Sequence, residues 1–317
     1  MTKFLVRKYS ERSMIPATEA VVEFEPKGKT SVRTTKISRS LPLRIEESSI
    51  IEGDALTVLR RLPDESVQCI ITSPPYWGMR DYGINDQIGL EVTLPQFIAS
   101  LVTVFRECRR VLRHDGTLWV NIGDGFTSGN RKWRAPDRKN PARAMDTRPD
   151  TPHGLKPKDL LGLPWRLAFA LQDDGWFLRA DVIWHKPNAM PESVRDRPTR
   201  SHEYLFLLSK SEKYFYDRNA VLEANGRNRR SVWDVHTQGG GGAHFATFPP
   251  KLIEPCIRAS SEPGDFVLDP FFGSGTVGLV AGELGRRYVG IELNPDYVRL
   301  AADRIAHRAK PIVRVSG

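Results

Sequence analysis

The sequence predicts an α/β protein built on one doubly wound sheet of seven strands. Seven short apolar segments alternate with helical segments, which is the pattern of a sheet covered by helices on both faces. A glycine-rich turn at residues 273–278 comes so late in the 317-residue chain that only one more strand follows it. The other strands must therefore precede this turn, and the sheet is predicted to be circularly permuted.

The elements follow from these patterns in chain order. Val67–Thr72 is apolar and β-branched, as expected of a buried parallel strand, and Phe266–Leu268 is a short apolar run that leads into the glycine turn. Between them, apolar residues recur every three or four positions from Leu94 to Leu112 and predict a helix. The predicted strands are Ser49–Ile51, Val67–Thr72, Thr117–Ile122, Ala180–His185, Tyr204–Leu208, Phe266–Leu268 and Tyr288–Ile291. The predicted helices are Leu56–Leu62, Leu94–Leu112, Lys158–Asp173, Pro249–Ser260, Thr276–Leu284 and Pro295–His307.

Composition narrows the class of protein. With 40% hydrophobic residues, 317 residues are enough for one large domain with a small appendage. There is no run of 18 apolar residues and no signal-peptide region, so we expect a cytoplasmic protein. Cys69, Cys108 and Cys256 form no CxxC pair, which argues against a disulfide framework or a zinc site, and we expect no metal. The net charge of +9 suits a polyanionic partner.

A proline turn follows the strand at residues 67–72. Pro74 and Pro75 cannot continue a central strand, so the chain must turn there and present Ser73, Tyr76 and Trp77 at the strand's carboxyl end. In open α/β sheets this end is where ligands bind. A hydroxyl, free carbonyls and aromatic faces could hold a flat ring with an amino group, as chemistry on an extruded nucleobase requires.

The glycine turn allows two interpretations. Residues 273–278 read as GxGxxG, and Glu292 ends the next strand, which is also the pattern of a dinucleotide-binding oxidoreductase. In that class the glycine motif opens the sheet, whereas here only 25 residues follow Glu292. The position therefore argues against a dinucleotide enzyme.

TSPPYW at residues 72–77, DPFFGSGT at 269–276 and GIELNPDY at 290–297 together resemble the motifs of DNA amino-methyltransferases. These enzymes transfer methyl groups from S-adenosylmethionine to exocyclic amino groups of bases. Because TSPPY precedes DPFFGSGT, the chain resembles the permuted β group of the family, over roughly residues 46–310. The resemblance implies a seven-stranded, Rossmann-like methyltransferase sheet with Tyr204–Leu208 as the antiparallel strand, and a small DNA-recognition segment.

The resemblance also implies a cofactor site. Asp269 would receive the α-amino group of the methionine moiety, and Glu292 would accept the ribose hydroxyls. Asp54 resembles the acidic residue that contacts the adenine amino group of the cofactor, although an Asp after a strand also caps helices. His244–Ile257 resembles the segment over the methionine end, and it also reads as an amphipathic helix with proline in its first turn. The expected cofactor-binding residues are Asp54, Asp269, Pro270, Phe271, Gly273, Ser274, Gly275, Thr276, Glu292 and Asn294.

The catalytic residues implied are Ser73, Pro74, Pro75 and Tyr76. An exocyclic amino nitrogen is a poor nucleophile, because its lone pair is delocalised into the ring. Acceptance of its N–H bonds by the Ser73 hydroxyl and the Pro74 carbonyl would favour a pyramidal nitrogen, while Tyr76 stacks on the base. In the family that the chain resembles, serine at the first motif position is associated mainly with N4-methylcytosine and aspartate with N6-methyladenine. We therefore expect cytosine and keep adenine as the alternative; Ser73 could also merely cap the turn.

Substrate contacts are expected from the aromatic residue after the motif, from the IWHKPN segment and from arginines in two polar loops. These residues are Trp77, His185, Lys186, Asn188, Arg195, Arg197, Arg227, Arg229 and Arg230. A histidine at a strand end is often structural, and a basic loop is often only solvated surface. Pro255-Cys256 would suit an enzyme that methylates the cytosine ring carbon, because that reaction needs a cysteine nucleophile. Cys256 lies in a helical apolar pattern, however, and is expected to be a buried core residue.

The expected division has four parts: a basic N-terminal arm at 1–45, a catalytic half at 46–209 with a basic insertion at 127–160, a target-recognition segment at 210–245 and a cofactor-binding half at 246–317. Double-stranded DNA is the expected partner. A cognate restriction endonuclease and a homodimer are partners that the resemblance allows. An RNA methyltransferase and an inactive DNA-binding scaffold are the remaining alternatives.

Overall fold

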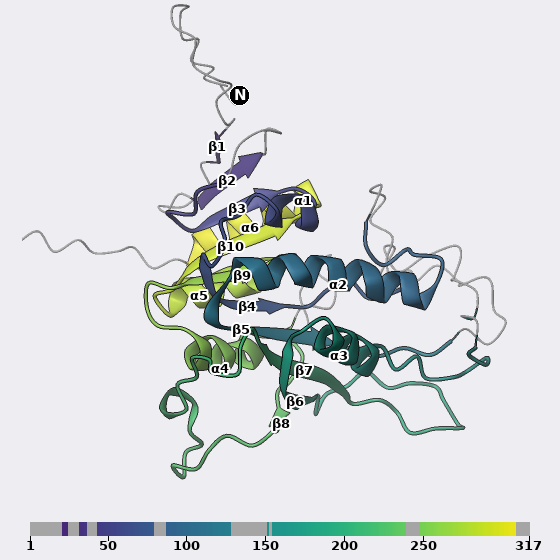
Figure 1. The fold of residues 1–317 in the computed structure, drawn as a ribbon. Coiled ribbons are helices and arrows are strands. Elements are labelled where there is room, and N and C mark those ends of the chain that lie inside the picture. The colour runs from purple at the N-terminus through teal and green to yellow at the C-terminus, as the bar shows by residue number, and fades with distance from the viewer. Residues whose placement is uncertain are drawn as a thin grey trace, which may run out of the picture.

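The computed structural model describes residues 21–24, 32–36, 43–78, 87–127, 151, 154–238 and 248–308. Within these residues ten strands form one sheet in the order β1-β2-β3-β10-β9-β4-β5-β7-β6-β8 (Figure 1). All seven predicted strands are confirmed, and β1, β2 and β8 extend the predicted sheet. The strands are β1 Val21–Phe24, β2 Val32–Lys36, β3 Ser49–Glu52, β4 Val67–Thr72, β5 Leu112–Ile122, β6 Phe177–His185, β7 His202–Ser209, β8 Val232–Asp234, β9 Phe266–Asp269 and β10 Arg287–Glu292.

The strand directions bring the chain's functional segments to one edge. β3, β10, β9, β4 and β5 are parallel, and β7 runs antiparallel to both β5 and β6, as predicted. The carboxyl ends of the parallel strands and the amino end of β7 therefore share an edge. Figure 1 shows the C-terminal β10 and α6 beside the N-terminal β3, so both ends of the described chain build the same region.

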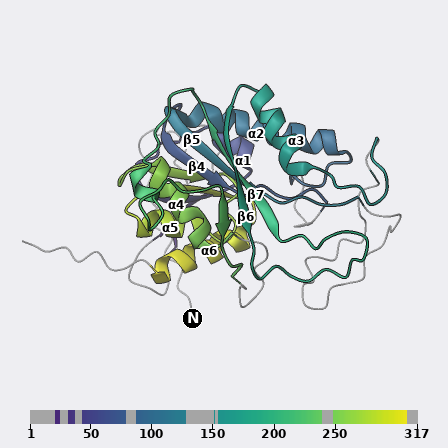
Figure 2. The ribbon, with the colours of Figure 1, turned by 90° about the horizontal axis from the view of Figure 1, so that it is seen from below.

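Six helices of the described residues cover the two faces of the sheet. α1 (Ala55–Leu59), α2 (Leu94–Val111) and α3 (Leu163–Asp173) pack on one face, and α4 (Pro250–Ser260), α5 (Thr276–Glu283) and α6 (Pro295–Arg308) pack on the other (Figure 2). β4 is buried on both sides, so Ile70 joins the first core while Cys69 and Ile71 join the second. No helix in the described part of the chain has the length and apolar character needed to cross a bilayer.

The start of α3 differs from the prediction. The sequence pattern predicts a helix from Lys158, but α3 begins at Leu163. Lys158 and Gly162 have positive φ angles of 69° and 67°, which a right-handed helix cannot contain. Leu160 instead forms an isolated antiparallel bridge with Phe126. A local pairing across the chain thus replaces the first predicted turn of the helix.

Three expected segments lie partly in the described residues. β1 and β2 fall within the expected N-terminal arm, and β2 pairs with β3. β8 falls within the expected recognition segment and pairs with β6. Of the basic insertion at 127–160, residues 128–150 and 152–153 lie outside the described residues.

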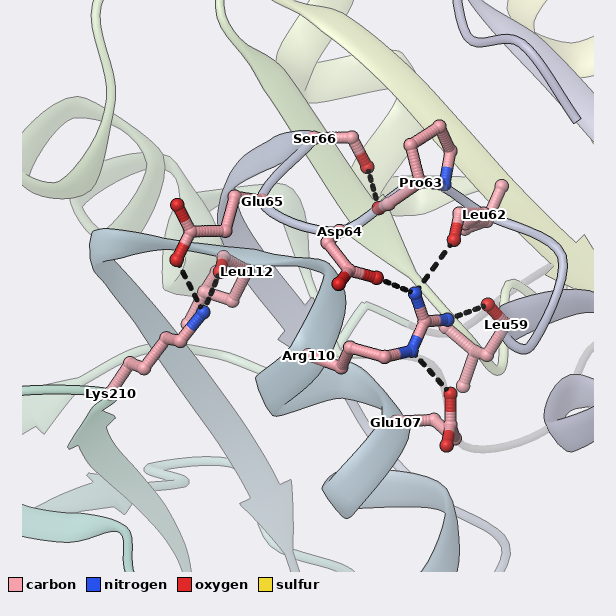
Figure 3. A network of polar contacts seen from close by, with 10 residues as sticks. All are labelled: Leu59, Leu62, Pro63, Asp64, Glu65, Ser66, Glu107, Arg110, Leu112 and Lys210. Atoms are coloured by element: carbon pink, nitrogen blue, oxygen red, sulfur yellow. Dashed lines mark hydrogen bonds and ion pairs between the residues drawn. The ribbon is translucent and has the colours of Figure 1, made fainter.

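Polar contacts stabilise the end of the sheet at which the parallel strand β4 begins, opposite the carboxyl ends of the parallel strands (Figure 3). Arg110, at the end of α2, donates to the carbonyls of Leu59 and Leu62 and pairs with Asp64 and Glu107. Lys210 bonds the Leu112 carbonyl and Glu65 nearby. These contacts join α1, α2, β5 and β7 at the edge where β4 begins, and so hold the strand that carries the proline turn.

Candidate active site

The proline turn leaves the sheet directly after β4. Thr72 is the last strand residue, Pro74 is buried, and Ser73 and Tyr76 are partly exposed. Trp77 is buried, with 6% of its surface exposed, and its indole N–H donates to the Glu91 carbonyl at 2.8 Å. Trp77 therefore anchors the turn on its buried side. The segment that follows, 79–86, lies outside the described residues.

The Tyr76 hydroxyl is the centre of a polar group at this edge. It donates to Glu203 Oε2 at 3.0 Å, and Glu203 Oε1 accepts from the Lys186 ammonium group. Burial and the Glu203 charge raise the pKa of Tyr76 well above its usual value, against hydrogen bonding from the Ser73 side chain and the Gly123 backbone that lowers it. The tyrosine thus keeps its proton at neutral pH. The end of β4, the end of β5, the end of β6 and the start of β7 all contribute to this group.

Asp269 ends β9 next to the proline turn. Its Oδ1 accepts the Thr72 hydroxyl at 2.6 Å and the Phe271 N–H at 3.0 Å. Both hydrogen bonds reach the same oxygen, so Oδ2 is the oxygen that can receive a ligand. Burial is the main cause that raises the pKa of Asp269 to about 7, and the two hydrogen bonds oppose it. Asp269 and the start of the proline turn are therefore joined through one buried hydroxyl, that of Thr72.

Glu292 ends β10, the next strand along. Its Oε2 accepts the Gly273 N–H at 2.7 Å and its Oε1 accepts the Asn294 N–H at 2.8 Å. Burial raises its pKa, while these backbone hydrogen bonds lower it. Gly53 donates to the Glu292 carbonyl at 2.9 Å, which brings Asp54 to the same edge. Asp54 caps α1 through the Thr57 N–H at 2.8 Å, so its predicted capping role is confirmed.

The glycine turn packs closely against α6. Gly275 has φ +77°, and a Cβ there would lie 2.9 Å from the Ala301 Cβ. At Gly273, also at positive φ, a Cβ would have only one ordinary contact, with the Phe271 carbonyl oxygen at 4.0 Å, so the backbone beside Glu292 is little crowded. The hydroxyls of Ser274 and Thr276 both accept from Arg304 at 2.9 Å, so they have an internal partner that ties the turn to α6. Pro270 and Phe271 complete the turn between β9 and Gly273.

The IWHKPN residues end β6 at the same edge. His185 Nδ1 lies 2.6 Å from Asp234 Oδ1, and Asn188 exchanges two hydrogen bonds with the Thr237 backbone. Lys186 lies 4.2 Å above the Trp184 ring while it pairs with Glu203. These three side chains therefore have partners within the protein, and they connect β6 to β7, β8 and the segment after β8.

The predicted arginines differ in their surroundings. Arg195 and Arg227 are exposed, and Arg230 pairs with Glu223 at 3.0 Å. Arg197 stacks 3.9 Å from the Phe126 ring centre and pairs with Glu192. Arg229 stacks 4.4 Å from the Trp233 ring centre and lines a groove of about 570 Å³ between α4 and residues 220–238. The residues lining this groove do not include Ser73, Tyr76, Asp269 or Glu292, so it is separate from the strand-end site.

The remaining sequence predictions concern α4. Cys256 is fully buried in the second core and its thiol contacts the Leu252 carbonyl, so the predicted core role is confirmed. Burial is the main cause that raises the pKa of its thiol well above the usual value, which disfavours a nucleophilic thiolate. α4 begins at Pro250 with proline in its first turn, as predicted. His244–Thr247, the start of the segment expected over the cofactor, lies outside the described residues.

Sequence reasoning missed four residues that organise this edge: Thr72, Gly123, Glu203 and Arg304. Glu203 directly precedes the apolar core of a predicted strand, a position that gave the only sequence signal for it. Gly123 follows β5 at a point where a Cβ would lie 3.1 Å from Tyr76 Cε2 and 3.2 Å from the Glu203 side chain. Their roles depend on contacts between distant strands, which no local pattern reveals.

Comparison with known proteins identifies the family. A family model described as DNA methylase, for the N6 and N4 class, matches residues 67–303. The type II methyltransferase M.XycI of Xanthomonas campestris pv. cyanopsidis is 68% identical over 285 residues, which cover 89% of this chain and 95% of the relative. M.Cfr9I of Citrobacter freundii is 64% identical over 294 residues, which cover 92% and 98%.

Solved structures share the architecture. The PvuII DNA methyltransferase, described as cytosine-N4-specific, aligns with a TM-score of 0.63 at 24% identity over 82% of this chain and 86% of its own, which shows a common fold. TTHA0409 of Thermus thermophilus, solved with S-adenosyl-L-methionine, aligns with a TM-score of 0.59 at 27% identity over 83% and 94%. With the family match over most of its length, the chain belongs to the N6/N4 DNA methylase family and is a DNA methyltransferase.

Proposed function

We propose that this DNA methyltransferase transfers a methyl group from S-adenosyl-L-methionine to the exocyclic N4 of cytosine, in double-stranded DNA and after base flipping. One observation carries the proposal. The serine-led turn, Ser73 to Tyr76, lies beside the carboxylate of Asp269, and the buried Thr72 hydroxyl bridges the two at 2.6 Å. Acceptors for a base amino group and a carboxylate for a cofactor ammonium group are thus adjacent.

The residues present fit the cofactor. Asp269 Oδ2 can receive an ammonium group, and Glu292, whose oxygens each hold only one backbone N–H, has lone pairs left for the ribose hydroxyls. The backbone at Gly273, beside Glu292, is little crowded. Asp54, Asn294 and the turn residues from Pro270 to Thr276 form the rest of the proposed site. When bound, the cofactor supplies a methyl group on a sulfonium, which is already activated for transfer.

The protein's own contribution is orientation. Ser73 Oγ and the Pro74 carbonyl accept hydrogen bonds from the amino group, which favours a nitrogen lone pair directed at the methyl group. Tyr76 offers its ring to the base, and Trp77 holds the turn from behind. Alignment of nitrogen and methyl carbon is worth several powers of ten in rate when reactants are held in line. His185, Lys186 and Asn188 border the base site from β6.

The choice of base rests on Ser73. A serine hydroxyl at the first motif position is what the family resemblance associates with cytosine N4, and an aspartate would favour adenine N6. The phosphate backbone is the proposed partner of the exposed arginines Arg195 and Arg227, with Arg197, Arg229 and Arg230 beside them. The type II names of the relatives support a modification enzyme that works with a restriction endonuclease of the same sequence specificity, and a homodimer is a further proposal.

Replacement of the catalytic hydroxyl tests the proposal. Ser73→Ala removes one acceptor of the amino N–H bonds, so we expect transfer of labelled methyl groups to duplex DNA to fall at least about 100-fold, while cofactor affinity by calorimetry stays the same. Ser66→Ala is the matched control, because Ser66 precedes β4 at the opposite edge, where its hydroxyl bonds the Pro63 carbonyl (Figure 3). Wild-type turnover by Ser73→Ala would remove Ser73 from the mechanism.

A further inference from the structure

Arg304 lies on α6, the helix that follows β10, and is not among the catalytic or binding residues proposed above. One nitrogen of its guanidinium group, Nη1, lies 2.9 Å from the Ser274 hydroxyl, 2.9 Å from the Thr276 hydroxyl and 3.1 Å from the Ser274 carbonyl oxygen. This nitrogen carries two N–H bonds, so the three acceptors must share them. A single group on α6 therefore holds both ends of the Ser274–Thr276 segment of the glycine turn.

The oxygens that Arg304 contacts are sheltered from water. Ser274 is 7% exposed and Thr276 is 3% exposed, so removal of their donor would leave buried polar groups without a partner. Within the described part of the chain, no carboxylate pairs with Arg304, whereas Arg299 on the same helix pairs with Asp296. The hydrogen bonds of Arg304 are thus directed to the turn.

Apolar packing brings α6 to the same turn. A Cβ at Gly275 would lie 2.9 Å from the Ala301 Cβ and 3.3 Å from Ile305 Cδ1, so only a glycine lets the helix approach this closely. Ala301, Arg304 and Ile305 occupy positions i, i+3 and i+4 and therefore share one face of the helix. An apolar contact and a polar contact act together on the turn from this face of α6.

Glu292 holds the start of the turn from the other side. Its Oε2 accepts the Gly273 N–H at 2.7 Å. The backbone from Gly273 to Thr276 is thus held by β10 at one end and by α6 at the other. A turn that the protein holds before the ligand arrives does not have to be ordered on binding, so less conformational entropy is lost and the affinity is higher.

We propose that Arg304 is a positioning residue for cofactor binding, which holds the Ser274–Thr276 segment in the conformation that receives S-adenosyl-L-methionine. It acts through the turn and need not touch the cofactor or the base. The inference deepens the proposed function and rests on the cofactor site beside Asp269 and Glu292. It predicts that loss of Arg304 weakens cofactor binding and leaves the methyl-transfer step itself unchanged.

The test compares Arg304→Met with wild type by calorimetry with S-adenosyl-L-methionine and by single-turnover methyl transfer to duplex DNA. Methionine keeps an apolar stem and removes the donors. We expect the Kd of the cofactor to rise about tenfold to a hundredfold, the range for loss of hydrogen bonds from a charged group. The transfer rate at saturating cofactor and the affinity for duplex DNA should stay within about twofold of wild type.

Arg308→Met is the matched control. Arg308 lies in the next turn of α6 and is exposed, so this change removes the same charge from the same helix. The cofactor Kd of Arg308→Met should equal that of wild type. A Kd raised equally by both changes would show an effect of charge alone and would overturn the role of the turn contacts.

A second comparison shows whether Arg304 acts through the turn. The combined variant Ser274→Ala/Thr276→Val removes both hydroxyl acceptors of Arg304. In this background, Arg304→Met should raise the cofactor Kd by a smaller factor than in wild type, because two of its three contacts are already lost. An equal factor in both backgrounds would contradict the proposal.

The remaining outcomes separate positioning from simple stabilisation. If Arg304 only stabilises the fold, Arg304→Met will lower the free energy of unfolding in urea but leave the cofactor Kd of the folded protein unchanged, which overturns the proposal. Should Arg304→Met fail to fold, Arg304→Lys decides, because it keeps the charge and most of the stem but lacks the planar fork; a wild-type Kd would then contradict the proposal. A wild-type protein that binds no S-adenosyl-L-methionine would overturn the proposed cofactor site together with this inference, whereas wild-type binding that Arg304→Met leaves intact overturns the inference alone.

Discussion

At the scale of single residues, the site depends on polar groups buried at strand ends. Thr72 is fully buried and Asp269 is 2% exposed, yet each satisfies the other through a 2.6 Å hydrogen bond. The same burial that makes Asp269 costly to ionise prepares it for a cationic ligand. An ammonium group beside Oδ2 would stabilise the charged form, so binding and ionisation should be linked.

The pKa of Asp269 predicts how cofactor binding depends on pH. Burial raises this pKa to about 7, so below pH 7 the carboxyl is largely protonated and must lose a proton to receive an ammonium group. Cofactor affinity should therefore rise with pH up to about 7 and then level off. Asp269→Asn should bind the cofactor weakly, and its affinity should not rise with pH in this range. Calorimetry between pH 5.5 and 8.5 checks it, and a wild-type affinity that is flat across pH 7 would refute the role of Asp269.

The same group affects the free protein in the opposite direction. Because the folded pKa lies above the ordinary value of 3.8, the folded state holds this proton more tightly than the unfolded chain. The free energy of unfolding should fall as pH rises from about 4 to 7, by up to roughly 4 kcal/mol from this group alone. Asp269→Asn should therefore be more stable than wild type above pH 7 without cofactor. Urea denaturation at pH 5 and pH 8 measures this difference.

At the scale of elements, the packing of β10, α5 and α6 depends on glycines that let strands and helices approach each other closely. Phe272 fills the space over β10 and α5: a Cβ at Gly290 would lie 2.3 Å from its ring, and one at Gly278 would lie 2.6 Å away. Phe272 also stacks on Tyr288, with ring centres 6.0 Å apart. The turn that carries Gly273 is thus built around one buried aromatic ring.

Two glycine substitutions separate packing from helix propensity. Gly290→Ala should lower the free energy of unfolding by about 1–3 kcal/mol or more, because the ring of Phe272 blocks the new methyl group. Gly282→Ala, in α5 with nothing near its Cβ position, should raise it by about 0.5–1 kcal/mol. Chemical denaturation of both variants tests the pair. Equal effects of the two changes would show that Phe272 does not constrain β10.

Local sequence patterns predicted the helices and strands well, but they predicted the contacts between these elements poorly. Buried strands such as β4 have continuous apolar runs, so all seven predicted strands are present. The predicted start of α3 was wrong, because the positive φ angles of Lys158 and Gly162 cannot be inferred from the spacing of apolar residues. The proline turn and the two carboxylates are visible in sequence, since each follows a strand. The contact of Glu203 with Tyr76 is not visible, because the two residues lie 127 positions apart along the chain.

At the scale of the whole molecule, one edge of the sheet gathers both halves of the chain. The proline turn follows β4, and the carboxylates of Asp269 and Glu292 end β9 and β10, almost 200 residues later; Thr72 and Asp269 are 197 positions apart. The order of the strands in the sheet, rather than their order in the sequence, therefore brings these residues together. The net charge of the whole chain, +9, suits a polyanionic substrate.

The most direct test of the central claim is the identity of the methylated base. Duplex DNA is incubated with the purified protein and labelled S-adenosyl-L-methionine, digested to nucleosides, and analysed by mass spectrometry, with Ser73→Ala as the inactive control. We predict that the label appears in N4-methylcytosine with wild-type protein and is lost with the variant. Label in N6-methyladenine would retain the family and the fold but contradict the assignment of cytosine from Ser73.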